Sequence, residues 1–282
     1  MKINVAKSAG FCFGVRRALK IAFESIKSGD EIEMLGDIVH NEEVVQKITK
    51  AGIKKIKRLR NGKNKTLLIR AHGAPEKTIA KAQSFGYTIV DATCPMVKEI
   101  HKIAMEMERK GYTIIIIGDK KHDEVRGIIG QLKRKAIVID SIENISFEII
   151  RKIKKAAVVV QSTQNMGKVI SVIDILKQYI RQLKVFNTIC KPTRIKQEEI
   201  KTMSLENDVM IIIGSKTSAN TRRLYEISKS LNKRSFWIQL SNEVKQEWFK
   251  GVKTVGITAG ASTPDTTTKK IVQKVRGSGL ES

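Results

Sequence analysis

The segment from Tyr87 to Ala104, YTIVDATCPMVKEIHKIA, contains one complete structural repeat of the chain. Its first residues, YTIV, are aromatic and β-branched, which is typical of a strand. After Pro95 the apolar residues recur at helical spacing, and proline favours the first turn of a helix. Cys94 therefore lies between the carboxyl end of a strand and the amino end of a helix. The free N–H groups and the dipole of a helix favour a thiolate there, which is the form that binds metals or attacks electrophiles.

The same order of apolar strand, small polar loop and amphipathic helix recurs along the chain. It is found in the segments LLIRAHGAPEKTIAKAQS (67–84), YTIIIIGDKKHDEVRGIIGQL (112–132), AVVVQSTQNMGKVISVIDILKQY (157–179), VMIIIGSKTSANTRRLYEISKSL (209–231) and TVGITAGASTPDTTTKKIVQKV (254–275). Strands that are apolar throughout indicate sheets covered on both faces, so the order predicts an α/β fold with mostly parallel sheets. In such folds ligands bind at the carboxyl ends of the strands.

The three cysteines repeat the arrangement of the opening segment. Cys12, Cys94 and Cys190 each stand between a strand and a helix, one in each third of the chain. This spacing predicts three similar α/β units, and if the units meet around an axis the three thiolates converge. The predicted ranges are 13–93, 94–190 and 191–275, the last joined by residues 1–12, with a flexible tail at 276–282.

Three chemical interpretations of the cysteines remain open at this point. A single free cysteine is usually a small buried hydrophobe. Three cysteines in matched positions suit either a zinc ion completed by another ligand or a 4Fe-4S cluster with one iron left uncapped. No C-x-x-C pair occurs, which favours the cluster. An odd number of cysteines in a chain with no secretory signal argues against a disulfide framework.

The chain is strongly basic, with 53 Lys and Arg against 28 Asp and Glu and a formal net charge of +25. This excess suits nucleic acid, an anionic membrane surface, a phosphorylated substrate or an acidic protein partner, and a biased genome or a hot habitat also produces it. The longest apolar runs are far too short to span a bilayer, so we expect a soluble, cytoplasmic protein. The basic run at 54–65 has no interleaved aromatic residue, which favours a solvated face over a site for single-stranded nucleic acid.

Three of the four histidines, His40, His72 and His122, fall at loop or element ends, where an imidazole can reach a ligand. In so basic a chain, an anion is a better candidate than a histidine-bound metal. His101 falls within a helix and is expected to be structural. Glu124, two residues after His122, has the position of a proton relay, although a lone glutamate usually faces solvent.

Two further loops, GSKTSANT (214–221) and TAGASTPD (258–265), each follow a strand and precede a helix. Their hydroxyls, amides and glycines are typical of loops that bind phosphate through backbone N–H groups at a helix terminus. The alternative is an ordinary helix cap formed by Thr221 or Ser262. Neither loop matches the nucleotide-binding glycine motifs, so nucleotide binding has little support.

Taken together, these motifs resemble the 4-hydroxy-3-methylbut-2-enyl diphosphate reductase family, also called IspH or LytB. The likeness extends over nearly the whole chain, through the ordered motifs GFCFGVRRAL (10–19), VHNEEVV (39–45), RAHGAPE (70–76), DATCPMV (91–97), HDEVRGIIGQ (122–131), QSTQN (161–165), NTICKPTRIKQEE (187–199), GSKTSANTRRLYEI (214–227) and VGITAGASTPD (255–265). So many motifs in one order make the resemblance specific.

The resemblance implies a trefoil of three α/β units around a central 4Fe-4S cluster. It implies that Cys12, Cys94 and Cys190 hold three irons, and that the substrate's hydroxyl binds the fourth, open iron. It implies reductive dehydroxylation of 4-hydroxy-3-methylbut-2-enyl diphosphate to isopentenyl and dimethylallyl diphosphate, the last step of the methylerythritol phosphate route to isoprenoids. Glu124 would supply protons with the hydroxyl of Ser162 nearby, and electrons would come from an acidic flavodoxin or ferredoxin. The implied diphosphate contacts are His40, His72, His122, Ser162, Ser218, Asn220 and Ser262.

Three positions depart from the family pattern. Ser162 stands where the family generally has Thr, Ala219 where a second Ser often precedes the Asn, and Asp123 where Pro is frequent. Asp123 would place a second negative charge near Glu124, which predicts a raised pKa of Glu124 through like-charge repulsion. Two rival functions stay open: a basic nucleic-acid-binding protein with a structural zinc site, and a related iron-sulfur enzyme acting on another phosphorylated substrate.

Overall fold

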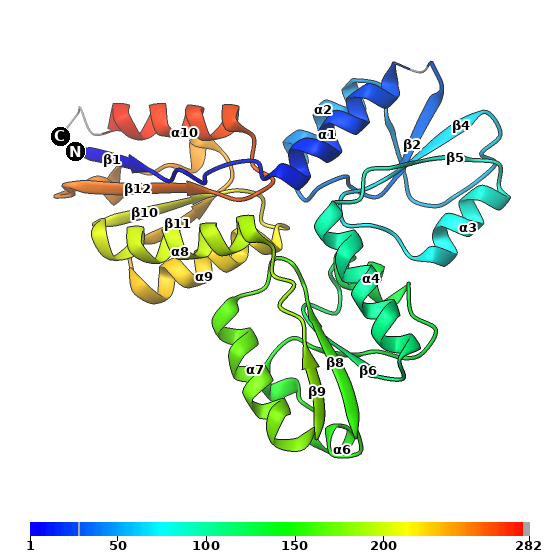
Figure 1. Ribbon diagram of the computed structural model, residues 1–282. Coiled ribbons are helices and arrows are strands. Elements are labelled where there is room, and N and C mark those ends of the chain that lie inside the picture. The colour runs from blue at the N-terminus through cyan, green and yellow to red at the C-terminus, as the bar shows by residue number, and fades with distance from the viewer. Residues whose placement is uncertain (28, 279–282) are drawn as a thin grey trace. The chain divides into compact units, whose positions relative to one another are not determined.

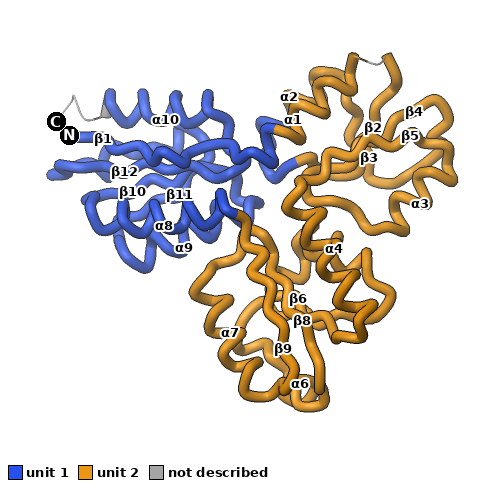
Figure 2. The backbone as a smooth tube through the Cα atoms, in the orientation of Figure 1, with its two compact units in different colours: residues 1–16, 39–45, 191–282 blue, residues 17–38, 46–190 orange. Residues whose placement is uncertain are grey.

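The computed structural model describes residues 1–27 and 29–278 (Figure 1). Within these residues there are three four-stranded sheets, and every strand pair in them is parallel. The predicted α/β class with parallel sheets is confirmed. The chain divides into two compact units (Figure 2): unit 1 is residues 1–16, 39–45 and 191–282, and unit 2 is residues 17–38 and 46–190.

Unit 1 contains one sheet with helices on both faces. Its strands, in spatial order, are β11 (Ser235–Ile238), β10 (Val209–Ile213), β12 (Thr254–Ala259) and β1 (Lys2–Val5). Helices α8 (Lys191–Glu206) and α9 (Ala219–Leu231) cover one face, and α10 (Asp265–Ser278) covers the other (Figure 1). Successive side chains of a strand point to opposite faces of its sheet. Along β10, Met210 and Ile212 therefore pack with the helices α8 and α9, whereas Ile211 packs with Ile271 of α10.

The first sheet of unit 2 follows the same plan. Its strands, in spatial order, are β3 (Lys54–Ile56), β2 (Glu31–Leu35), β4 (Lys65–Ile69) and β5 (Thr88–Asp91). The helices that connect to it are α1 (Phe13–Ile26), α2 (Glu42–Lys50) and α3 (Glu76–Ser84). Leu67 and Ile69 of β4 form a buried cluster with Ala82 of α3.

The second sheet of unit 2 has the strand order β7 (Ile137–Ile139), β6 (Thr113–Ile117), β8 (Lys155–Val160) and β9 (Gln182–Val185). Its helices are α4 (Pro95–Arg109), α5 (Asp123–Ile129), the short α6 (Phe147–Ile150) and α7 (Met166–Tyr179). Ile114 and Ile116 of β6 pack with α4 and α5, whereas Ile115 and Ile117 pack with α7. The run IIII in β6 is therefore apolar because both faces of the strand are covered.

All three sheets share one strand order. In the two sheets of unit 2, counted along the chain, the second strand lies at one edge, followed by the first, the third and the fourth. In unit 1, β10, β11 and β12 take the places of the first, second and third strands. In unit 1 the place of the fourth strand is taken by β1, which pairs with β12 through the register Lys2 to Thr254 and Val5 to Ile257. The connections leave the adjacent first and third strands in opposite directions, so a ligand is expected at the carboxyl ends of these two strands, a position we call the crevice of each sheet.

The predicted ranges 13–93 and 94–190 each contain one whole sheet, and 191–275 contains the three remaining strands of the unit 1 sheet. The boundaries of three separate units stay a prediction. Of the predicted tail, residues 276–278 belong to α10, and residues 279–282 lie outside the described residues. Three 3₁₀ helices complete the described elements: η1 (Ile142–Asn144), η2 (Ser241–Glu243) and η3 (Gln246–Phe249).

Two expectations about the surface can be compared with the structure. In the part of the chain that the structure describes, no helix combines the length and apolar character needed to cross a membrane. The basic run at 54–65 begins with the edge strand β3, and its Lys and Arg side chains are exposed except for the partly buried Lys65. The side chains are exposed, as a solvated face requires, and the choice against a nucleic-acid site stays a prediction.

Candidate functional site

The residues singled out in the sequence lie at equivalent places in the three sheets. The segments after the first strand carry His40 (after β2), His122 and Glu124 (after β6), and Ser218 and Asn220 (after β10). Glu124 and Asn220 are the second residues of the helices α5 and α9. Loops after the third strand carry His72 (after β4), Ser162 (after β8) and Ser262 (after β12). These two strands flank the crevice of each sheet, which is where an α/β fold binds ligands.

The cysteines follow the fourth strand of each sheet. Cys94 follows β5, Cys190 follows β9 and Cys12 follows β1, and a helix begins at the next residue in every case. Among the described residues none of the three forms a disulfide, and all three are of intermediate exposure. Each cysteine thus lies at the N-terminus of a helix, where the helix dipole favours a negative charge. The helix is α4 for Cys94, α8 for Cys190 and α1 for Cys12.

Backbone hydrogen bonds fix each cysteine beside the loop after the third strand of its own sheet. The N–H of Cys94 donates to the carbonyl of Ala71 at 2.9 Å, and that of Cys190 donates to Ser162 at 3.1 Å. The N–H of Cys12 donates to Ala261 at 3.2 Å. The sulfur of Cys12 also accepts the N–H of Val15 at 3.5 Å. The three sites therefore have the same local architecture, which the spacing of the cysteines predicted.

In unit 1, the segment 39–45 lies against the loops of the sheet. Ser262 Oγ donates to the carbonyl oxygen of His40 at 3.0 Å. Ser218 is the N-cap of α9 and accepts the N–H of Thr221 at 3.3 Å. Asn220 is 5% exposed, and its Nδ2 atom is buried with no hydrogen-bond partner among the described residues. An amide donor left unsatisfied in this way is available for an anion in the crevice.

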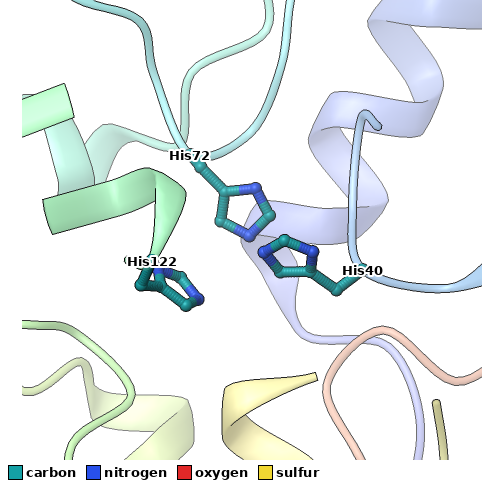
Figure 3. A group of neighbouring side chains, drawn as sticks. All are labelled: His40, His72 and His122. Atoms are coloured by element: carbon teal, nitrogen blue, oxygen red, sulfur yellow. The ribbon is translucent and has the colours of Figure 1, made fainter. Parts of the chain in front are cut away.

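In unit 2, two of the predicted histidines meet. His72, on the loop after β4, and His122, at the start of α5, approach edge to face with ring centroids 5.5 Å apart (Figure 3). His122 is the N-cap of α5, and its Nδ1 accepts the N–H of Glu124 at 3.1 Å. This bond places the proton of a neutral His122 ring on Nε2, so that Nε2 is a donor. His40, which is labelled in the same figure, belongs to unit 1.

Glu124 and Ser162 form a buried pair. Glu124 is 2% exposed. Its Oε1 accepts the backbone N–H of Ser162 at 2.6 Å, and its Oε2 accepts the hydroxyl of Ser162 at 2.7 Å. Burial raises the pKa of Glu124, and the two hydrogen bonds from Ser162 oppose that rise. The carboxyl group is thereby suited to hold a proton at a pH where an exposed glutamate has lost it.

The like-charge explanation for Glu124 is wrong, because the cause of its raised pKa is burial and Asp123 is not among the contributors. Instead, Asp123 Oδ2 pairs with Arg70 Nη1 at 2.7 Å, and the two side chains are 20% and 19% exposed. This ion pair joins the end of β4, two residues before His72, to the residue after His122. The extra negative charge therefore helps to hold the two histidine-bearing loops together.

We expect the substitution Asp123→Asn to lower the free energy of unfolding by about 1 kcal/mol, or the melting temperature by roughly 2–4 °C, because Arg70 is left half-buried without its carboxylate. Thermal unfolding of D123N, R70Q and the double variant measures the coupling between the two residues. The exposed pair of Lys177 and Asp174 serves as the control, and D174N should have almost no effect. Additive losses in the double variant would contradict the ion pair.

His101 is buried in α4, as expected for a structural residue. It is 8% exposed, and burial lowers its pKa to about 4. Its ring packs against Gly73 and Gly127: a Cβ atom at Gly73 would lie 2.9 Å from the His101 ring, and one at Gly127 would lie 3.2 Å from the carbonyl oxygen of His72. The two glycines thus let α4, α5 and the His72 loop pack closely.

Lys196 was missed in the sequence. It lies in α8 with 2% exposure, and its Nζ donates to the carbonyl oxygen of Ala259 at 3.0 Å and to that of Ser8. The missed signal was helical periodicity, because Lys196 falls on the buried stripe of α8 that also contains Thr193, Ile200 and Met203. A lysine on a buried stripe calls for a specific partner.

The family model described as LytB protein matches residues 3–276 of this chain. The chain belongs to the LytB protein family. One LytB relative, the 4-hydroxy-3-methylbut-2-enyl diphosphate reductase of Aquifex aeolicus, is 40% identical over 278 residues, covering 97% of this chain and 96% of that protein. The protein of the same name from Clostridioides difficile is 38% identical over 274 residues, covering 96% of this chain and 98% of its own.

Two solved structures resemble this chain along almost its whole length. One is described as (E)-4-hydroxy-3-methyl-but-2-enyl diphosphate reductase, the terminal enzyme of the non-mevalonate pathway; it has a TM-score of 0.72 and 40% identity, covering 98% of this chain and 100% of that one. The other is the E-1-hydroxy-2-methyl-but-2-enyl-4-diphosphate reductase from Plasmodium falciparum, with a TM-score of 0.89 and 26% identity, covering 96% of this chain and 87% of that one. The LytB resemblance stated from the motifs is confirmed.

Proposed function

We propose that this chain is an enzyme that reduces 4-hydroxy-3-methylbut-2-enyl diphosphate to isopentenyl and dimethylallyl diphosphate. Two electrons and two protons enter the reaction, the allylic C–O bond breaks, and the hydroxyl leaves as water. The proposal is supported by the names of the LytB relatives and by their coverage of nearly the whole chain. The structural observation that carries it is the repeated site, with a cysteine after the fourth strand of each sheet and polar side chains at each crevice.

We further propose that Cys12, Cys94 and Cys190 hold a 4Fe-4S cluster. The donor set fits this group, because the three cysteines form no disulfide among the described residues, are only partly buried, and each directly precedes a helix, and thiolates are the usual ligands of such clusters. Equivalent positions in three sheets give three ligands and no fourth, which is the pattern for a cluster with one uncapped iron. When bound, that cluster supplies the electrons and a Lewis-acidic iron that polarises the leaving hydroxyl.

The diphosphate is proposed to bind the polar side chains at the ends of the strands. The proposed donors are those implied by the resemblance: His40, His72, His122, Ser162, Ser218, Asn220 and Ser262. The support is the unsatisfied Nδ2 of Asn220, the Nε2 proton of His122, and the short donors at the N-terminus of α9. Ala219 begins α9 directly after the cap Ser218, so the position that departs from the family pattern still offers its backbone N–H near the terminus.

Glu124 is proposed to deliver protons to the reacting carbon or oxygen, with Ser162 as its partner. The carboxyl group is held in a single orientation by two hydrogen bonds from one residue. The carbonyl of the same residue accepts the N–H of Cys190, so the proton source is tied to one of the proposed cluster ligands through a single intervening residue. Ser162 keeps the hydroxyl that the family's usual threonine would provide.

The decisive experiment is purification without air, followed by iron and sulfide analysis and an assay with the named diphosphate and a strong reductant. We expect about four irons and four sulfides per chain and formation of both products. A colourless, zinc-loaded and iron-free protein would favour the nucleic-acid-binding alternative. An intact cluster without turnover of this substrate would favour an enzyme that acts on another phosphorylated compound.

The electron donor is proposed to be an acidic flavodoxin or ferredoxin, in keeping with the net charge of +25. Because opposite charges accelerate encounter and salt screens them, the rate of electron transfer from such a donor should fall by about tenfold or more from low to high salt. Stopped-flow reduction at several salt concentrations measures this rate. Reduction by a small uncharged reductant is the control and should change little. A donor rate independent of salt would contradict the charge argument.

The cytoplasmic location stays a prediction.

A further inference from the structure

Lys196 is a buried cation whose hydrogen bonds go to main-chain oxygens. Its Nζ joins the carbonyl of Ser8, in the loop between β1 and α1, to that of Ala259, at the end of β12. The nearby carboxylate of Glu199 accepts the N–H groups of Lys7 at 2.6 Å and Ser8 at 3.0 Å. Two side chains of α8 therefore hold the loop that leads to Cys12.

The Lys196 ammonium lies close enough to Cys12 for the charges of the two side chains to interact. Burial lowers the pKa of Lys196 to about 8. Nearby negative charges oppose this decrease in the pKa, that of Cys12 most strongly, followed by those of Glu199 and Asp265. Arg16 is a further cation in this surrounding. The Lys196 ammonium thus lies in a region of low polarity, where a charge acts strongly on its neighbours.

The equivalent positions in the helices that follow the other two cysteines are occupied by uncharged residues. Helices α1, α4 and α8 all begin one residue after a cysteine, so the sixth residue after each cysteine occupies the same place. These residues are Ala18, Ile100 and Lys196, which are 0%, 1% and 2% exposed. An apolar side chain satisfies the packing at two of the three places. The lysine therefore needs an explanation other than packing.

We propose that Lys196 is a positioning residue that fixes the Ser8–Cys12 loop and places a positive charge near Cys12, so that it favours the reduced state of the metal centre held by the cysteines. This inference rests on the proposed function. A reduced centre carries one more negative charge than the oxidised one, and a fixed cation stabilises the more negative state. Net charge and hydrogen bonding around the sulfur atoms are among the main determinants of cluster potential.

The test is a redox titration of anaerobically purified protein, followed by its absorption and by electron paramagnetic resonance. We expect the midpoint potential of Lys196→Met, which keeps the volume and loses the charge, to be more negative than that of the parent. Lys196→Arg should restore most of the difference. The matched control is Lys201→Met, a change of the same kind at an exposed position of α8, which should leave the potential unchanged.

Each outcome separates the inference from the function on which it rests. If the parent contains no iron and sulfide, the proposed function fails before Lys196 is tested. If the parent holds a cluster and Lys196→Met has the same potential as the parent, the charge role is overturned. If Lys196→Met does not fold, Lys196→Gln replaces it, because its amide can still donate to the carbonyls of Ser8 and Ala259 while the charge is absent. A lower potential in that variant supports the inference, and an unchanged one overturns it.

Discussion

Replacing Glu124 by Gln is expected to lower turnover of the diphosphate by about 100-fold or more, the usual contribution of a positioned proton donor. Glutamine preserves the shape of the site, since its oxygen can accept the N–H of Ser162 and its amide can donate to the Ser162 hydroxyl. Iron content and substrate affinity should therefore stay near those of the parent. The effect should appear in kcat rather than in KM.

The raised pKa of Glu124 gives this prediction a dependence on pH. A proton donor acts in its protonated form, so turnover of the parent should fall as pH rises through the raised pKa of Glu124. The folded protein holds this proton more tightly than the unfolded chain does. Its free energy of unfolding should therefore also fall as pH rises from the ordinary carboxyl range through the raised value. Both trends should be absent from E124Q.

The control for this variant is a second buried carboxylate in the same unit. Glu108 is 8% exposed and accepts the backbone N–H groups of Lys133 at 3.1 Å and Arg134 at 2.7 Å. Glu108→Gln should leave turnover unchanged, whatever its effect on stability. Turnover of E124Q within a few-fold of the parent would exclude Glu124 as the proton donor.

Replacing Cys94 by Ser is expected to abolish turnover and to reduce the iron and sulfide content well below that of the parent. A serine hydroxyl stays protonated where a thiol at a helix N-terminus ionises, so the cluster loses one of its three proposed protein ligands. Cys190→Ser and Cys12→Ser should behave in the same way, because all three residues precede a helix in the same manner. Metal analysis and the visible absorption spectrum measure the loss.

The control is a substitution by serine at a helix N-terminus that carries no cysteine. Asn165 is the N-cap of α7 in the same unit, and its side chain accepts the N–H of Lys168 at 3.1 Å. Asn165→Ser retains a capping oxygen and should keep full iron content. Three cysteine variants that each retain the parent's iron would show that these sulfur atoms do not hold a cluster.

Much of the fold follows from local sequence patterns. Runs such as IIII in β6 and VMIII in β10 read as buried strands because both of their faces are covered. Prolines and small polar residues mark the starts of helices, so Cys94, Cys190 and Cys12 could be assigned to helix N-termini in advance. The predicted threefold repetition appears as the shared strand order of the sheets.

Other features depend on contacts between distant residues, which no local pattern contains. The charge of Asp123 looked like a neighbour of Glu124 along the chain, but its partner is Arg70, which follows a different strand. Lys196 looked like one more exposed lysine in a basic chain, and its burial depends on carbonyl groups at Ser8 and Ala259. Helical periodicity marks the buried stripe, yet it does not reveal that the stripe includes an ammonium group.

The pairing of β1 with β12 has a consequence for biosynthesis. Residues 2–5 leave the ribosome well before residues 254–259, with which they pair as a strand. At ordinary elongation rates that partner is made on the order of tens of seconds later. The Cys12 loop, which is held through Ala261 and Ala259, therefore cannot take its final structure until residues 254–261 have been made. Delivery of the proposed cluster to a finished Cys12 site would therefore follow synthesis of residues 254–261, whereas the sheets that precede Cys94 and Cys190 can fold before those residues are made.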